Sequence, residues 1–94
     1  MEPRVVFLER DSVKAEFSRP AARHTWMDYP DTRPEDIVDR LRDAQIAVIN
    51  KLRIDAAVLA RLPQLRMIAL AATGADNVDL AACRASGIVV SNVR

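Results

Sequence analysis

Four short apolar runs without polar alternation constrain the fold of this chain more than any other feature. They occupy residues 5–8, 46–49, 65–72, where Arg66 is the one polar residue, and 88–90. A strand buried on both faces gives such an unbroken run, whereas a strand with one wet face alternates. Helical segments of about ten residues separate the later runs, which is typical of a parallel sheet with covered faces. We therefore expect an α/β fold with a flavodoxin-like, doubly wound parallel sheet.

Signals for helix ends support this arrangement. Residues 32–35 read Thr-Arg-Pro-Glu, the spacing of a capping box with proline in the first turn, and predict a helix to about residue 44. Asp55 is expected to cap a helix that Pro63 ends. A third helix over 79–85 has Gly87 as its C-terminal stop and Cys83 as a small core residue. Its expected apolar face is Val78, Ala81, Ala82 and Ala85.

One further strand is expected at the edge of the sheet. Residues 24–29, which read His-Thr-Trp-Met-Asp-Tyr, precede Pro30 and predict a short edge strand. Trp26 and Tyr29 are expected to cover that edge of the sheet. His24 is expected at the surface, because a lone histidine without a candidate partner is a poor general base.

Composition excludes several classes of protein. The 94 residues carry a formal net charge of +1 with interspersed signs, so no basic stripe points to nucleic acid. No run approaches the ~20 apolar residues of a membrane span, and no signal peptide is visible, so we expect a cytoplasmic protein without a membrane partner. A single cysteine excludes an internal disulfide and a cysteine-based zinc site.

Ligands of open parallel sheets bind beyond the carboxyl ends of the strands, so the residues there are the candidate site. They are Glu9-Arg10-Asp11, Asn50-Lys51, Thr73-Gly74-Ala75-Asp76 and Ser91-Asn92. Gly74 either exposes backbone N–H groups to a carboxylate or phosphate or simply makes a tight turn. Asn50 and Lys51 either hold the polar groups of a small anion or form a solvated loop. Glu9 and Asp11 have the chemistry of metal ligands, but caps and surface charges are commoner.

A glycine-rich nucleotide loop is absent from the sequence. The fingerprint G-x-G-x-x-G needs three glycines within six residues. This chain has only two glycines, Gly74 and Gly87, which lie far apart. We therefore expect no cofactor-binding residues within these 94 residues. We also assign no metal ligands.

Two segments carry a resemblance to a known family. Residues 65–83 read LRMIALAATGADNVDLAAC, and residues 87–93 read GIVVSNV. This order of apolar strand, T-G-x-D-N-V-D, helix and G-I-x-V-x-N resembles the D-isomer-specific 2-hydroxyacid dehydrogenases. Residues 48–51 (Val-Ile-Asn-Lys) with the capped helix that follows, together with residues 5–12, are similar to the glycerate dehydrogenase (hydroxypyruvate reductase) branch.

The resemblance implies a two-domain, NAD- or NADP-dependent enzyme that transfers hydride from the reduced cofactor to a 2-keto acid such as hydroxypyruvate or glyoxylate. Residues 1–94 would be the N-terminal segment of its substrate-binding domain, with a Rossmann domain after residue 94. By the same resemblance, amides around Thr73, Gly74 and Ala75 hold the substrate carboxylate, while Asn50 and Lys51 contact its far end. The catalytic Arg, Glu and His of the family have no counterpart here. The resemblance thus implies that the segment is inactive alone and that the complete enzyme is a homodimer.

Two readings from other classes stay open at this point. A small parallel α/β domain also suits a receiver-like signalling module, for which Glu9 and Asp11 would mimic the acidic cluster. The second predicted strand, however, ends at Asn50 rather than at an aspartate. The other alternative is a stand-alone ligand-binding module. The ending at Arg94, directly after a strand, favours a segment of a longer chain, which we expect to expose apolar surface where a missing segment packs.

Overall fold

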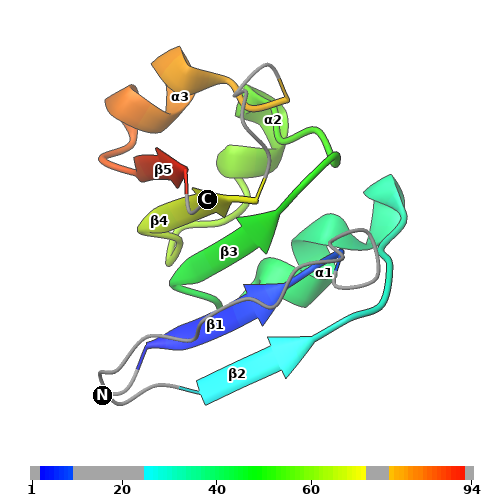
Figure 1. Ribbon diagram of the computed structural model, residues 1–94. Helices are drawn as coiled ribbons and strands as arrows, with labels where there is room; N and C mark the ends of the chain where they lie inside the picture. The colour runs from blue at the N-terminus through cyan, green and yellow to red at the C-terminus, as the bar shows by residue number, and fades with distance from the viewer. Residues whose placement is uncertain (1–2, 10–24, 72–76, 93–94) are drawn as a thin grey trace.

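The computed structural model describes residues 3–9, 25–71 and 77–92. Five parallel strands form one sheet in the order β2-β1-β3-β4-β5 (Figure 1). The strands are β1 (Arg4–Phe7), β2 (Thr25–Asp28), β3 (Ile46–Ile49), β4 (Met67–Leu70) and β5 (Val89–Asn92). This is the flavodoxin-like strand order, with its switch point between β1 and β3. The predicted α/β fold is confirmed.

The register of the strands brings their carboxyl ends to one edge of the sheet. Phe7 of β1 lies opposite Val48 of β3, and Ile49 lies opposite Leu70 of β4. Leu70 in turn lies opposite Asn92 of β5. The residues that follow β1 and β3 are consequently neighbours in space although about forty residues separate them in sequence. We call this edge of the sheet the carboxyl edge.

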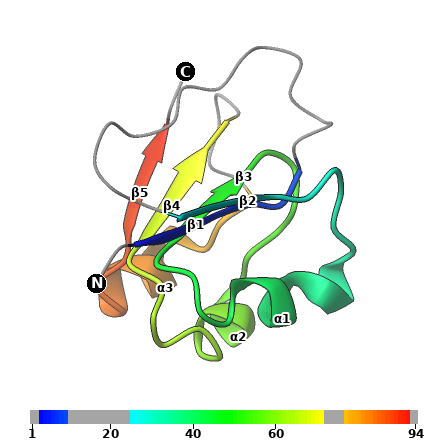
Figure 2. The same ribbon diagram turned by 90° about the horizontal axis from the view of Figure 1, so that it is seen from below.

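The described α-helices α1 (Ile37–Leu41), α2 (Ala56–Leu59) and α3 (Leu80–Ala85) all lie on one face of the sheet (Figure 2). The chain moves in one direction across the sheet from β2 to β5, and right-handed crossovers then place the connecting helices on one face. Alternate strand residues, such as Val6, Ala47 and Ile68, belong to the main core cluster, to which the buried residues of all three helices also belong.

The opposite face of the sheet has a smaller buried cluster. Val5, Phe7, Val48 and Ala69 form it, and the half-buried Trp26 packs against it. Helices over this face, which a doubly wound sheet implies, would lie outside the described residues. Tyr29 packs against the main cluster, so the prediction that Trp26 and Tyr29 cover the β2 edge is confirmed.

Two of the three described α-helices have side-chain caps, of which the one at Asp55 was predicted. The Asp55 carboxylate accepts a hydrogen bond from the Val58 amide at 3.0 Å, and the Asp79 carboxylate accepts one from the Ala82 amide at 3.0 Å. Gly87 has a φ of +74°, as expected for a residue that ends a helix in the left-handed region. Helix α2 ends at Leu59, earlier than the proline stop predicted.

The capping box predicted at Thr32 is wrong. The segment starts as a short 3-10 helix, η2 (Pro34–Asp36), whose N-cap residue is Arg33 and which has no side-chain cap. The Thr32 hydroxyl instead donates to the Leu8 carbonyl at 2.8 Å. A contact with the end of β1 therefore takes the hydroxyl that the local motif assigned to the helix.

The predicted apolar face of the third helix is also partly wrong. Ala81 and Ala85 are exposed, whereas Val78 and Cys83 are buried. The ends of this short helix determine its rotation, because Val78 forms a bridge with Ile54 and the Ile88 amide donates to the Cys83 carbonyl at 2.8 Å. The prediction that Cys83 is a core residue is confirmed.

Exposed apolar side chains occur on separate elements. Met27 on β2 and Val89 on β5 lie at opposite edges of the sheet, and Leu80 lies on α3. Whether a further segment covers any of them stays a prediction. None of the helices within the described ranges has the length and apolar character needed to cross a bilayer.

Candidate functional site

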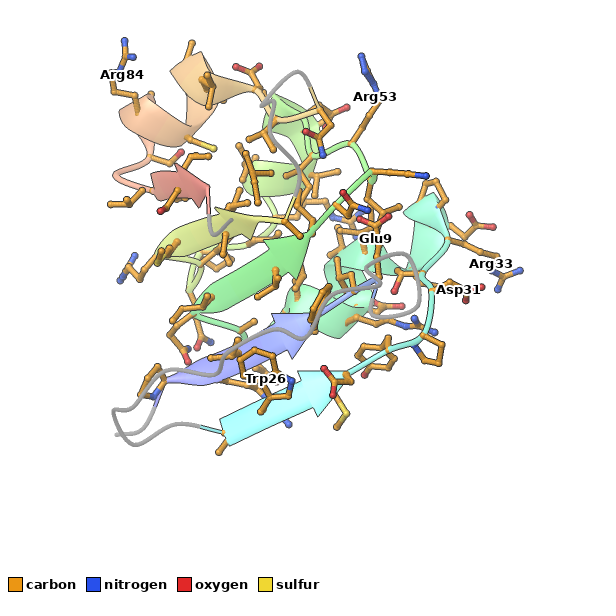
Figure 3. The ribbon with its side chains drawn as sticks, in the orientation of Figure 1. Glu9, Trp26, Asp31, Arg33, Arg53 and Arg84 are labelled. Atoms are coloured by element: carbon orange, nitrogen blue, oxygen red, sulfur yellow. The ribbon has the colours of Figure 1, made fainter. Side chains whose placement is uncertain are left out.

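The candidate site is the loop of residues 50–52, which follows β3 at the carboxyl edge. Glu9, which follows β1 and Leu8, reaches this loop with its side chain (Figure 3). Its Oε2 atom accepts hydrogen bonds from the backbone N–H groups of Asn50 at 2.6 Å, Lys51 at 2.8 Å and Leu52 at 3.0 Å. Three successive amides around one anionic oxygen form a backbone anion site, here filled by the protein's own carboxylate.

Asn77 holds the same loop through its carbonyl groups. Its Nδ2 atom donates to the Leu52 carbonyl at 2.8 Å and to the Asn50 carbonyl at 3.2 Å. Immediately beyond the loop, the Ile54 amide donates to the Asn77 carbonyl at 2.8 Å, next to the bridge between Ile54 and Val78. Loop 50–52 is therefore tied to the end of β1 and to the segment before α3.

The outward-facing groups of the loop are cationic. Lys51 and Arg53 are exposed, and Arg53 points away from the sheet at this edge (Figure 3). A hollow of about 210 Å³ adjoins the loop, lined by Arg53, Ile54, Asp55, Asn77, Val78 and Asp79. The edge thus combines a hydrogen-bonded backbone with exposed cationic side chains, while the hollow beside the loop also carries the carboxylates of Asp55 and Asp79. Such a mixture of charges suits a small polar ligand.

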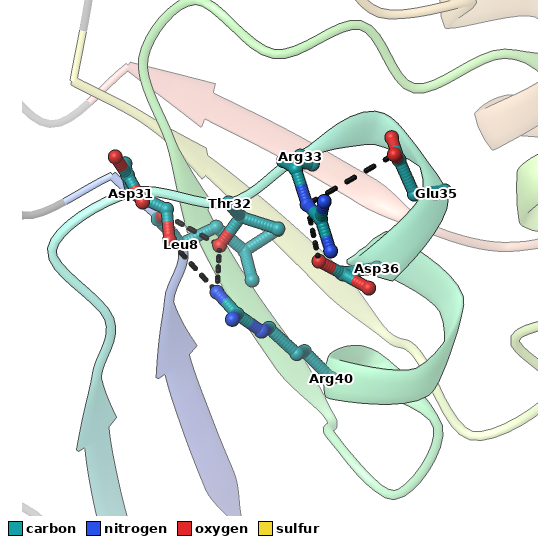
Figure 4. Close-up of polar contacts among 7 residues, drawn as sticks. All are labelled: Leu8, Asp31, Thr32, Arg33, Glu35, Asp36 and Arg40. Atoms are coloured by element: carbon teal, nitrogen blue, oxygen red, sulfur yellow. Dashed lines mark hydrogen bonds and ion pairs between the residues drawn. The ribbon is translucent and has the colours of Figure 1, made fainter.

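A second set of contacts supports the end of β1. The Thr32 hydroxyl binds the Leu8 carbonyl, and Arg40 donates to the Thr32 hydroxyl at 2.7 Å and to the Asp31 carbonyl at 2.7 Å (Figure 4). The Arg40 guanidinium also stacks over the Tyr29 ring at 4.1 Å from its centroid. These contacts connect α1 and the segment after β2 to the residue directly before Glu9.

The exposed ion pairs of the same region contribute less. Arg33 contacts Asp36 at 3.2 Å and Glu35 at 3.9 Å, and all three side chains retain access to solvent (Figure 4). Exposed pairs of this kind contribute little to stability, because water screens them and their side chains lose freedom.

The positions of the predicted site residues can be compared with these contacts. Asn50 and Lys51 lie at the carboxyl edge, as expected, with Asn50 half-buried and Lys51 exposed. Thr73, Gly74 and Ala75 lie outside the described residues, as do His24 and Asp11. The roles of the five predicted site residues in substrate binding stay predictions; these residues are Asn50, Lys51, Thr73, Gly74 and Ala75.

The sequence analysis missed the role of Glu9. Its side chain is buried, with 8% of the residue exposed, and its carboxylate binds amides rather than standing as a surface charge. The sequence signal that could have identified this role is an acidic residue directly after one buried strand, where a second buried strand lies beside the first. Across the described ranges, no three His, Cys, Asp or Glu side chains gather in a group suited to a metal ion.

The fold perturbs the ionisation of Cys83. Burial, and secondarily the nearby Asp79 carboxylate, raise the pKa of the Cys83 thiol. The protonated thiol is a poor nucleophile, and the residue lies in the core rather than at the carboxyl edge. Cys83 is therefore a packing residue.

Comparison with known proteins gives the class of this chain. The model of the family "D-isomer specific 2-hydroxyacid dehydrogenase, catalytic domain" matches residues 5–94. The chain belongs to this family, as the resemblance in its sequence indicated.

Individual relatives narrow the comparison. A glycerate dehydrogenase of Methylorubrum extorquens is 49% identical over an alignment that covers 100% of this chain and 30% of the relative. A 2-hydroxyacid dehydrogenase of Haemophilus influenzae is 40% identical over 96% of this chain and 29% of the relative. The chain therefore spans about a third of the length of these relatives. The glycerate dehydrogenase branch predicted from residues 48–51 fits these relatives.

A solved structure supports the fold. The NAD⁺-bound 3-phosphoglycerate dehydrogenase of Entamoeba histolytica superposes with a TM-score of 0.76 at 21% identity. The match covers 98% of this chain and 33% of that structure. The five-stranded sheet of the present chain is thus the fold found in the corresponding third of that dehydrogenase.

Proposed function

We propose that this chain is the substrate-binding part of an NAD(P)-dependent oxidoreductase that reduces 2-keto acids of the hydroxypyruvate and glyoxylate type. The observation that carries the proposal is the hydrogen-bonded loop 50–52, which presents Lys51 at the carboxyl edge of the sheet. The whole chain that contains this loop is similar in sequence to a glycerate dehydrogenase. The carboxyl edge of such a sheet is where its ligands bind.

The residues of this chain would bind and orient the substrate. Backbone amides around Thr73, Gly74 and Ala75 would hold its carboxylate, as the family resemblance implies. Asn50 and Lys51 would contact the far end, where the hydroxymethyl group of hydroxypyruvate can accept a hydrogen bond from an ammonium group. Holding both ends of a three-carbon acid aligns its C2 carbon for hydride transfer.

The cofactor would be held elsewhere in the complete protein. The reduced cofactor, NADH or NADPH, would supply the hydride when bound. With two separated glycines, these 94 residues have no dinucleotide fingerprint. We accordingly assign the cofactor and the catalytic acid and base to a further domain, and expect the segment alone to be inactive. We further propose that the complete enzyme is cytoplasmic and, by resemblance, a homodimer.

The contacts of Glu9 argue against the signalling alternative. A receiver-like module needs carboxylates open to a metal ion and a phosphoryl group after its first strand. Glu9 is buried and accepts three backbone hydrogen bonds instead. We therefore favour the dehydrogenase.

The test is an assay of the complete gene product with hydroxypyruvate and with glyoxylate, each with NADH and with NADPH. We expect substrate-dependent oxidation of at least one cofactor, which is measured as the loss of the near-ultraviolet absorbance of NADH or NADPH. Lys51→Met keeps the aliphatic stem but removes the charge, so it should raise KM for hydroxypyruvate by about tenfold and change KM for glyoxylate little. Absence of cofactor oxidation with both substrates would overturn the proposal.

A further inference from the structure

The backbone of loop 50–52 is hydrogen-bonded by two side chains from outside the loop. Glu9 binds its three N–H groups, and Asn77 binds the carbonyls of its first and last residues. We call this pair of side chains the Glu9–Asn77 clamp. The two side chains are far apart in the sequence: Glu9 follows β1, and Asn77 precedes α3.

The chemistry of the clamp is directional. A buried carboxylate is costly unless hydrogen bonds compensate for the lost water, and the three amides of the loop do this for Glu9. The amide group of Asn77 supplies donors for carbonyls that a carboxylate cannot satisfy. The N–H groups of the loop are thus held by the acceptor of one side chain, and its carbonyl groups by the donor of another.

The clamp has a consequence for recognition. The N–H groups of residues 50–52 are already bound to Glu9, so the loop does not offer them to an incoming anion. Discrimination by this loop must then come from side chains, of which Lys51 is exposed. A fixed backbone lets a flexible lysine reach a small ligand with less loss of freedom on binding.

From these contacts, which no local motif encodes, we infer that Glu9 and Asn77 are positioning residues for the far end of the substrate. They act through loop 50–52, which holds Lys51 in place, and touch neither substrate nor cofactor. The inference rests on the proposed function for the identity of the substrate. It predicts that loosening the clamp impairs recognition of whatever substituent the 2-keto acid carries beyond C2.

The first test measures the clamp without relying on activity. Amide hydrogen exchange of the peptide covering residues 50–52 is compared in the complete gene product and in Glu9→Gln and Asn77→Asp. Glu9→Gln keeps the shape but replaces a charged acceptor with a neutral one, and Asn77→Asp removes the donor. Glu35→Gln, an exposed glutamate with the same loss of charge, is the matched control.

We expect exchange at residues 50–52 to accelerate on the order of tenfold in each clamp variant and to be unchanged in Glu35→Gln. Unchanged exchange in both clamp variants would overturn the inference. The two variants attack the loop from different sides, so a folding failure in one leaves the other to decide. Thermal melting of each variant identifies such a failure.

The second test separates positioning from a general structural role. Hydroxypyruvate carries a hydroxymethyl group beyond C2, whereas glyoxylate has only hydrogen there. Glu9→Gln and Asn77→Asp should raise KM for hydroxypyruvate about tenfold with little change in kcat, and leave both constants for glyoxylate within about twofold. Adding Lys51→Met to Glu9→Gln should raise KM for hydroxypyruvate little further, because both substitutions remove the same interaction, the contact of Lys51 with the substrate.

The outcomes distinguish the two proposals. Equal loss with both substrates means that the clamp is structural only, and it overturns the positioning role while the proposed function stands. If the wild-type protein oxidises cofactor with neither substrate, the proposed function fails and the positioning role falls with it. Faster exchange without a substrate-dependent change in KM also overturns the positioning role.

Discussion

Replacing Thr32 with valine tests how far the carboxyl edge depends on a single buried hydroxyl. The Thr32 hydroxyl donates to the Leu8 carbonyl at 2.8 Å, and Leu8 is fully buried directly before Glu9. Valine has nearly the same volume but no donor, so the Leu8 carbonyl would lose this bond in a place where water does not reach it. Leaving a buried acceptor unsatisfied costs about 1–3 kcal/mol.

Arg40 adds little to that estimate. It donates to the Thr32 hydroxyl, but it also donates to the Asp31 carbonyl at 2.7 Å and lies over the Tyr29 ring. Arg40 is only partly buried, so water can replace the contact that Thr32→Val removes. We therefore expect the loss to come almost wholly from the Leu8 carbonyl.

Native-state hydrogen exchange measures this loss within the domain itself. A destabilisation of 1–3 kcal/mol corresponds to roughly 5- to 150-fold faster exchange of amides in β1 and β3, because exchange there requires the region to open. Thr32→Ser, which keeps the hydroxyl, should lose much less. Thr25→Val, at an exposed site on β2, is the matched control and should change stability by less than about 0.5 kcal/mol. Exchange in Thr32→Val within about twofold of wild type would refute the reasoning.

Three further changes probe other parts of the fold. Asp79→Ala removes the cap on the Ala82 amide and should cost about 1 kcal/mol by the same exchange measurement on α3, whereas Asp79→Asn should cost less. A Cβ at Gly87 would meet no atom within 4 Å, but the φ of +74° there is unfavourable for residues with a side chain. Gly87→Ala should therefore lower the free energy of unfolding by about 1 kcal/mol, and Gly87→Asn should lower it less. Because the folded-state pKa of the Cys83 thiol is raised, its contribution to stability is fully present below the unfolded thiol's pKa and is lost as pH rises through the folded one. Alkylation of Cys83 should therefore begin at higher pH than that of a free thiol, and Asp79→Asn should lower that pH; alkylation at the pH of a free thiol would contradict this.

The elements of the fold were predictable because each one rests on local chemistry. Unbroken apolar runs predicted β1, β3, β4 and β5. Asp55 predicted the start of α2, since an aspartate beside free amides needs no distant partner, and Asp79 makes the same kind of cap on α3. The edge strand β2 was found from its aromatic and polar mixture before Pro30.

The errors came from contacts between residues far apart in the sequence. Thr32 has the spacing of a cap, but its hydroxyl bonds to a carbonyl 24 positions earlier. Glu9 resembled a surface charge, but its partners lie 41 to 43 positions later. No window of local sequence contains these pairs, and only the register between β1 and β3 brings them together.

The position of Glu9 follows from the topology of the sheet. At the switch point, the chain leaves β1 toward β2 and leaves β3 toward β4, so the segments after the two strands diverge. The bond from the Leu8 amide to the Val48 carbonyl, 3.1 Å long, is a backbone link between these strands just before they part. Directly beyond this bond, the Glu9 side chain connects the end of β1 to the backbone of residues 50–52. Under the proposed function, a ligand that enters the crevice would meet a loop whose backbone is already hydrogen-bonded, and the preference among ligands would be left to the side chain at position 51.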